Sequence, residues 1–229
     1  MTKKEIKEKS VVTEAPEQEE ILVIARKVLY PKGAHHGLRI ENLEEIMEAI
    51  NSHATFVPRF LEPDSDPTLL DTEHDPSLKQ IIPYMVFVHN GQVFLMQRKD
   101  DHTEKRLAGQ STLGIGGHLR KNEFTDFHNY SSMAEAIFAW AKREFVEEVD
   151  YQGDFKVTVL GLINDDTAPV HAVHAGLALL IEGDSSEIKA KDEHKEGRMV
   201  SIDECAEDYD TLENWSKIVF ETLKQNAKN

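Results

Sequence analysis

Hydrophobic and polar positions follow two different periods along this chain, and the changes between them predict an order of strands and helices. Short apolar runs rich in β-branched residues and bounded by turn residues predict strands, whereas apolar stripes three or four residues apart predict helices. Strands are expected over 20–30, 81–88, 92–98, 154–163, 170–181 and 198–202, and helices over 42–50, 133–149 and 210–224. The pattern shows no internal repeat, so one mixed fold of strands and helices is expected.

Local motifs mark where several of these elements begin and turn. Asn90-Gly91 separates the two central apolar runs and is the strongest hairpin turn in the chain. Ser132-Met133-Ala134-Glu135 matches a capping box, which predicts a helix beginning at about residue 133. Asn42, with Glu45 three residues later, is expected to cap an earlier helix in the same way.

The helix expected over 133–149 has two chemically distinct faces. Its apolar stripe should pack on the core: Phe138, Ala141, Phe145 and Val149. Glu144, Glu147 and Glu148 stand at i, i+3 and i+4, so their carboxylates share another face. Like charges at this spacing repel one another unless cations lie among them, and Mg²⁺ takes oxygen ligands of this kind. By itself the spacing fits a solvated acidic surface better than a metal site.

Composition narrows the class of protein. The chain has 229 residues, 40% of them hydrophobic, and a formal net charge of -16. Such an acidic surface disfavours binding to nucleic-acid duplexes and anionic membranes. Cys205 is the only cysteine, which excludes an intramolecular disulfide, and no stretch has the length and composition of a signal peptide or membrane span. A cytoplasmic protein is expected, with a loose tail over 1–19 and a single domain over 20–229.

Two motifs together carry a resemblance to a known family. Gly116-Gly117 follows a short β-like run, and Arg143-Glu144-Phe145-Val146-Glu147-Glu148 lies in the acidic helix. The pair resembles the signature of the Nudix hydrolases, in which a glycine, five residues, a glutamate and seven residues precede Arg-Glu-x-x-Glu-Glu. The chain departs from this pattern at the first glutamate and at Asp150, which replaces a glycine that ends the family's helix.

The first glutamate of the signature has two candidates. Glu135 keeps the seven-residue spacing to Arg143 but lies 18 positions after Gly117, so about twelve residues would be inserted before it. Glu123 keeps the spacing to Gly117 but lies too far from Arg143 along the chain. We prefer Glu135, because it keeps the helical register and belongs to the capping box.

The resemblance implies a fold and a reaction. It implies an α+β fold of Nudix type, an α/β/α sandwich with a mixed β-sheet, over about 80–225, with an N-terminal strand–helix extension over 20–79. It implies metal-dependent hydrolysis of a phosphoanhydride in a diphosphate linked to another group, with Mg²⁺ or Mn²⁺ as cofactor and a small phosphorylated molecule as substrate. The order of elements also looks similar to a bacterial subgroup of predicted Nudix phosphoesterases, and family members often form homodimers.

Residue roles follow from the same resemblance, position by position. Metal ligands would be Glu144, Glu147, Glu148 and the carbonyl group of Gly116. Arg143 would pair with Glu135 or Glu144 and hold that carboxylate in place.

The general base of the family is either a helix glutamate, here Glu147, or one from a later loop. Glu193 and Glu196 lie in the corresponding loop, and Glu196 is preferred. Its alternative is a solvated side chain.

The substrate itself is left open by the sequence. Arg98, at the end of a predicted strand, could reach a phosphate or stay on the surface, and His118, directly after the glycines, could touch substrate. The inserted segment 120–131 would shape the substrate site or form a solvent loop.

Two other functions are known for Nudix-like folds. An isomerase of the isopentenyl diphosphate type has a Nudix-like fold, but the cysteine expected near Gly116-Gly117 is missing. A non-catalytic Nudix-fold binding or regulatory module would be expected to lose helix glutamates, whereas this chain keeps all three. Dependence of diphosphate turnover on metal would separate an enzyme from a module.

Overall fold

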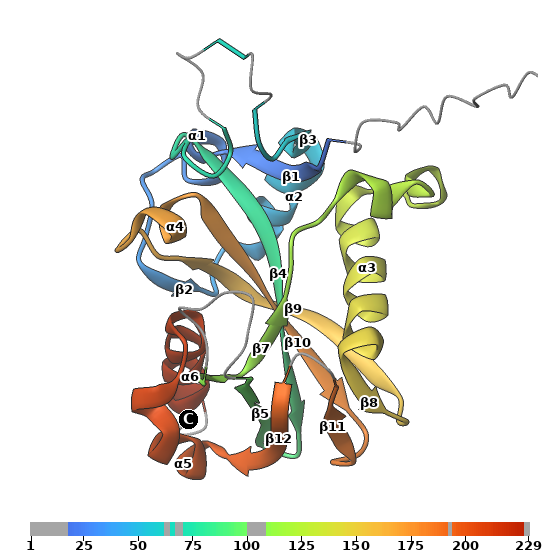
Figure 1. Ribbon diagram of the computed structural model, residues 1–229, viewed down its shortest axis with the longest axis vertical. Helices are drawn as coiled ribbons and strands as arrows, with labels where there is room; N and C mark the ends of the chain where they lie inside the picture. The colour runs from blue at the N-terminus through green and yellow to red at the C-terminus, as the bar shows by residue number, and fades with distance from the viewer. Residues whose placement is uncertain (1–17, 62–64, 67–70, 100–108, 192–193, 227–229) are drawn as a thin grey trace, which may run out of the picture.

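A mixed β-sheet lies between two layers of helices in the computed structural model (Figure 1). The structure describes residues 18–61, 65–66, 71–99, 109–191 and 194–226. Most of the tail expected over 1–19 and part of the loop expected over 62–76 therefore lie outside the described residues. The predicted α+β architecture with a mixed sheet is confirmed.

The main path of the sheet runs in the order β12–β5–β4–β10–β9–β2. These strands are β12 (His194–Ser201), β5 (Gln92–Arg98), β4 (Leu78–His89), β10 (His174–Gly183), β9 (Phe155–Asn164) and β2 (Gly37–Arg39). The central neighbours β4 and β10 are parallel, with Gln80 opposite His174, and the other pairs on this path are antiparallel. Parallel neighbours need a long crossover connection, and here that crossover carries the signature motifs.

Short strands extend the sheet at both ends of β4. They are β1 (Glu20–Ala25), β3 (Thr55–Pro58), β6 (Ser111–Thr112) and β7 (Gly114–Gly116). β1 pairs with β3 and β4, β6 pairs with β5, and β7 pairs with β4. β8 (Val149–Tyr151) and β11 (Ile188–Ala190) form a separate two-stranded sheet.

The helices divide between the two faces of the sheet (Figure 1). One face is covered by α1 (Arg26–Leu29), α2 (Leu43–His53) and α3 (Met133–Glu148), and the other by α5 (Ile202–Cys205) and α6 (Asn214–Asn226). Within the residues that the structure describes, the connections add α4 (Pro169–Ala172) and the 3₁₀ turns η2 (Lys121–Phe124), η3 (Phe127–Asn129) and η4 (Ala206–Thr211). Among the described residues, no helix has the length and apolar character needed to cross a membrane.

The elements predicted from local motifs agree with the structure where those motifs dominate the backbone. The hairpin β4–β5 turns at Asn90 and Gly91, whose φ angles of 47° and 77° suit this tight turn. α3 begins after Ser132, whose hydroxyl oxygen accepts a hydrogen bond from the backbone N–H of Glu135.

Three local predictions are wrong. The strand expected over 20–30 ends at Ala25, because the chain turns into α1 there. Asn42 has a left-handed φ of 56° and forms no capping hydrogen bond through its side chain. The strand expected over 170–181 begins only at His174, because Pro169, whose fixed φ suits a first helical turn, starts α4.

The rotation of α3 about its axis is fixed by the side chains that it buries. Phe145 is fully buried and its ring stacks on that of Phe87 in β4, with centroids 5.8 Å apart and planes 7° apart. The buried positions of the helix are Ala136, Ile137, Trp140, Ala141 and Phe145. Because these positions face the sheet, the glutamates of α3 are turned toward its rim.

Replacement of Phe145 by Ala should lower the free energy of unfolding by about 3–5 kcal/mol, because it leaves a cavity under α3. Val146 is the matched control, since it is the next residue of the same helix and is 43% exposed. Val146→Ala should change the free energy by less than about 0.5 kcal/mol. Urea denaturation followed by circular dichroism measures both values, and equal effects of the two substitutions would contradict the assigned rotation of α3.

Candidate active site

The N-terminal end of α3 is anchored from two directions. The hydroxyl oxygen of Ser132 caps the helix, and Oδ1 of Asn51 in α2 accepts a hydrogen bond of 2.8 Å from the backbone N–H of Ala134. Both contacts satisfy backbone donors that a helix start leaves unpaired. α2 thus contributes directly to the placement of the acidic helix.

The glycine loop lies against the acidic face of α3. A Cβ atom added at Gly117 would lie 3.8 Å from Oε1 of Glu144 and 3.7 Å from the Trp140 ring. At Gly116, a Cβ atom would lie 2.6 Å from the carbonyl oxygen of Pro83, so any side chain there would force the backbone to shift. The close approach of β7 to β4 therefore requires glycine at position 116, and it places this loop beside Glu144.

The glutamate that pairs with Arg143 is not the expected one. Arg143 forms ion pairs with Glu123, at 3.8 Å, and with Glu147, at 3.5 Å. Glu123 also accepts a hydrogen bond of 2.9 Å from Nε1 of Trp140. The carboxylate of Glu135 instead accepts hydrogen bonds from the backbone N–H and the hydroxyl group of Ser131.

The prediction that Arg143 pairs with Glu135 or Glu144 is therefore wrong. Glu123 lies within η2, and η3 follows before α3 begins; this turn-rich segment places Glu123 at the side of α3. The sequence did contain a sign of this arrangement, namely the five residues between Gly117 and Glu123. The number of residues between Glu123 and Arg143 does not predict their separation in space, because the tight turns between them keep the segment short.

The electrostatics of Glu144 set it apart from an ordinary surface glutamate. Glu144 is half-buried, and it forms no hydrogen bond or ion pair with any residue that the structure describes. Burial raises its pKa above the ordinary value, and the negative charges of Glu123 and Glu147 raise it further. Arg143 and Arg120 act in the opposite direction but do not compensate.

The other predicted metal ligands lie nearby in the fold. Glu147 is exposed, Glu148 is half-buried at the last position of α3, and Gly116 is exposed at the end of β7. Within the described part of the chain, no three His, Cys, Asp or Glu side chains are already arranged around a common point that could hold a metal ion. The carboxylates share a region, but their arrangement is not that of a closed metal site.

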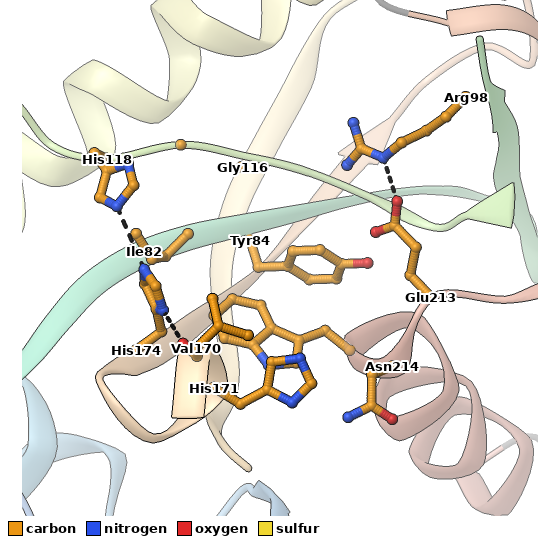
Figure 2. Close-up of a pocket in the computed structure, with 12 residues that line it drawn as sticks. Ile82, Tyr84, Arg98, Gly116, His118, Val170, His171, His174, Glu213 and Asn214 are labelled. Carbon is orange, nitrogen blue, oxygen red and sulfur yellow. Dashed lines mark hydrogen bonds and ion pairs between the residues drawn. The ribbon is translucent and has the colours of Figure 1, made fainter. Parts of the chain in front are cut away.

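A cavity of about 230 Å³ opens beside the glycine loop, on the side of α6 (Figure 2). Its lining comes from β4, β5, β7, α4, β10 and the start of α6: Ile82, Tyr84, Arg98, Gly116, Gly117, His118, Val170, His171, His174, Glu213, Asn214 and Trp215. The structure therefore brings the two predicted substrate contacts, Arg98 and His118, to one cavity.

The polar groups of this cavity have partners within the protein. Nε of Arg98 donates to Oε1 of Glu213, and both side chains are largely buried. His118 lies 2.7 Å from Oε1 of Gln80, and burial together with nearby positive charge lowers its pKa to about 3. His118 is thus a neutral ring near neutral pH, and a role for Arg98 at a phosphate stays a prediction.

Glu196 is not among the residues that line this cavity. It is an exposed residue of β12 and lines a separate cavity with Arg198 and Asp208. Among the described residues, no hydrogen bond or ion pair joins Glu196 to α3, and Glu193 is not one of the described residues. Its proposed role as general base stays a prediction.

Comparison with known proteins agrees with this geometry. No protein-family model matches the chain. Protein YmaB of Bacillus subtilis (strain 168) is 35% identical over 161 residues, which cover 67% of this chain and 75% of YmaB. The solved structure of Tm1382, provisionally assigned as a Nudix hydrolase, is 28% identical and superimposes with a TM-score of 0.68 over 90% of this chain and 98% of Tm1382. With its fold, its glycine loop and its acidic helix, the chain belongs to the Nudix hydrolases, a family of pyrophosphohydrolases.

Proposed function

We propose that the protein hydrolyses a phosphoanhydride bond in a small diphosphate-containing molecule and that a divalent cation supports the reaction. The observation that carries this proposal is the state of Glu144. A half-buried carboxylate beside two other carboxylates, with no described partner of its own, is costly unless positive charge is supplied to it. A substrate phosphate alone would increase the repulsion.

The donor set fits Mg²⁺ or Mn²⁺ in chemical terms. Both are hard cations that bind carboxylate and carbonyl oxygens and keep positions for water and phosphate. Glu144, Glu147, Glu148 and the carbonyl group of Gly116 would hold the ion. When bound, such an ion polarises phosphoryl oxygens and lowers the pKa of a water molecule.

Arg143 and Glu123 fit positioning roles in this proposal. Arg143 contacts Glu147 and Glu123, and Glu123 is itself held by the indole N–H of Trp140. This chain of contacts fixes the direction of Glu147 without using Glu144. Residues that orient metal ligands in this way commonly change activity by 10- to 100-fold when removed.

Of the two candidate bases, we propose Glu147 rather than Glu196 as the proton acceptor for the attacking water. It lies on α3 beside Glu144, where the cation and the diphosphate would be held. In the reaction a water oxygen bonds to phosphorus, its proton passes to the base, and the bridging oxygen leaves with the electron pair of the broken P–O bond. Glu196 borders a different cavity.

The first prediction concerns catalysis by the intact protein. Release of phosphate or monophosphate from a panel of diphosphates should require Mg²⁺ or Mn²⁺ and stop when a chelator removes it. Glu147→Gln should reduce kcat/KM by about a thousandfold, since a metal contributes several kcal/mol to the transition state. Glu123→Gln should reduce it by about 10- to 100-fold.

Glu135→Gln is the matched control for both variants. Glu135 is a fully exposed glutamate of α3, and its carboxylate accepts hydrogen bonds from Ser131. This variant should keep nearly full activity. Turnover that survives the chelator, or equal losses in the Glu123 and Glu135 variants, would contradict the assigned roles. Absence of turnover in folded protein that still binds the diphosphates would favour a binding module.

A second prediction concerns the charge of Glu144 in metal-free protein. Because Glu123 raises the pKa of Glu144, Glu123→Gln should move that pKa down toward the ordinary value. NMR titration of the Glu144 carboxyl carbon measures the change, and Glu135→Gln should leave the pKa unaltered. An unchanged or higher pKa in Glu123→Gln would show that Glu123 does not act on Glu144.

A further inference from the structure

A buried carboxylate stands behind one wall of the cavity. Asp165, just after β9, is fully buried. The amide group of Asn214 and the backbone N–H of Thr167 both donate to it, and Nδ1 of His36 lies 3.6 Å from Oδ1. Burial raises the pKa of Asp165, but the hydrogen bonds from the backbone and side chain of Thr167 lower it, and the net result is a pKa below the ordinary value. Asp165 is therefore an ionised, immobilised acceptor.

His171 links this carboxylate to the cavity. Nδ1 of His171 is buried and lies 2.7 Å from Oδ2 of Asp165 in an ion-pair contact that does not have the alignment of a hydrogen bond, while the ring itself lines the cavity (Figure 2). Two unprotonated acceptors at this separation would repel each other, so Nδ1 carries the hydrogen. In the neutral ring Nε2 is then an acceptor. Nε2 has no hydrogen-bond or ion-pair partner among the residues that the structure describes.

The charge of the cavity limits what Nε2 can meet there. The arginine in the lining, Arg98, is neutralised by Glu213, and His118 is neutral because its pKa is lowered to about 3. Apolar walls come from Tyr84 and Trp215, whose rings meet edge to face. A phosphate buried here would find little positive charge, whereas an uncharged group could displace water from the apolar wall.

The position of the cavity supplies the connection to the reaction. Gly116 and Gly117 line it, and Gly117 also lies against Glu144 of α3. A diphosphate held at the acidic face of α3 would therefore direct the group attached to it past the glycine loop and into the cavity. This step rests on the proposed function, which places the diphosphate at those glutamates.

We propose that the cavity binds an uncharged group of the substrate that carries a hydroxyl or amino donor, and that Nε2 of His171 accepts the hydrogen bond from that donor. Asp165 is a positioning residue, because its negative charge beside Nδ1 favours the form of the ring that carries the hydrogen there. Together they would select diphosphates that carry such a group over inorganic pyrophosphate and over substrates with a phosphate at that end. If Asp165 and His171 had only a structural role, they would connect α4 to the start of α6 and would not affect which diphosphates bind.

The test measures binding rather than turnover. Calorimetry with Ca²⁺ in place of Mg²⁺ would compare ADP-ribose, UDP-glucose and NADH with inorganic pyrophosphate. At least one of the three should bind the native protein more tightly than pyrophosphate. His171→Phe should weaken that ligand about five- to tenfold, the value of one hydrogen bond, and leave pyrophosphate unchanged.

Two further variants and one spectroscopic measurement complete the design. His171→Gln keeps an acceptor oxygen and should retain part of the affinity, and His53→Phe, on the exposed end of α2, should retain all of it. In native protein, the ¹⁵N resonance of Nε2 in His171 should move on addition of the tightest ligand and not on addition of pyrophosphate. This last measurement does not depend on whether a variant folds.

Either of two results would overturn the inference: no ligand of the panel binds more tightly than pyrophosphate, or His171→Phe weakens all ligands equally with no movement of the Nε2 resonance. The proposed hydrolysis is tested separately. If ligand binding depends on His171 but the protein hydrolyses no diphosphate, the proposed function is contradicted and the inference is not. If the protein hydrolyses diphosphates normally but His171→Phe has the same affinities as the native protein, the inference is contradicted and the proposed function is not.

Discussion

Repulsion among carboxylates is the constraint on which the site depends. Glu123 and Glu147 lie close enough to Glu144 that the negative charge of each disfavours ionisation of the Glu144 carboxyl group. The sheet overcomes this repulsion through apolar packing of α3, in which Phe145 and Trp140 are buried. The fold thus concentrates negative charge at a place where it would not gather spontaneously, which is the arrangement that a cation-binding site requires.

Residues at the start of β1 and the segment between β7 and α3 support this arrangement together. The backbone N–H of Leu22 in β1 donates to the carbonyl group of Leu119, and Glu19 and Glu20 form ion pairs with Arg120 and Lys121. These contacts hold the chain at the point where η2, which contains Glu123, begins. Most of the ion pairs are partly exposed and individually weak, but their combination with a strand edge restricts the direction in which the segment leaves the sheet.

Local sequence determined how much could be predicted. The hairpin at Asn90-Gly91 and the start of α3 at Ser132 depend on side chains next to each other, and both predictions are correct. The partner of Arg143 depends on how many residues two 3₁₀ turns occupy, and periodicity carries no information about that. The strand expected from residue 170 also gave a wrong position for His171, because in a strand His171 and His174 would point to opposite faces. In the structure Pro169 starts the short helix α4 instead, and both histidines line the same cavity.

The parallel pairing of β4 with β10 has a consequence for the assembly of the molecule. Gln80 and His174 are neighbours in the sheet but lie far apart in the chain, and every signature residue falls between them. Contacts with such long sequence separation form late and slow the folding reaction. While the chain is being synthesised, α3 can form as a helix, but the strand that completes the central sheet emerges from the ribosome only afterwards. A nascent chain that stops before β10 would display the acidic helix without the cavity beside it, so the two halves of the site become coupled only when β10 and the start of α6, which also line the cavity, have been synthesised.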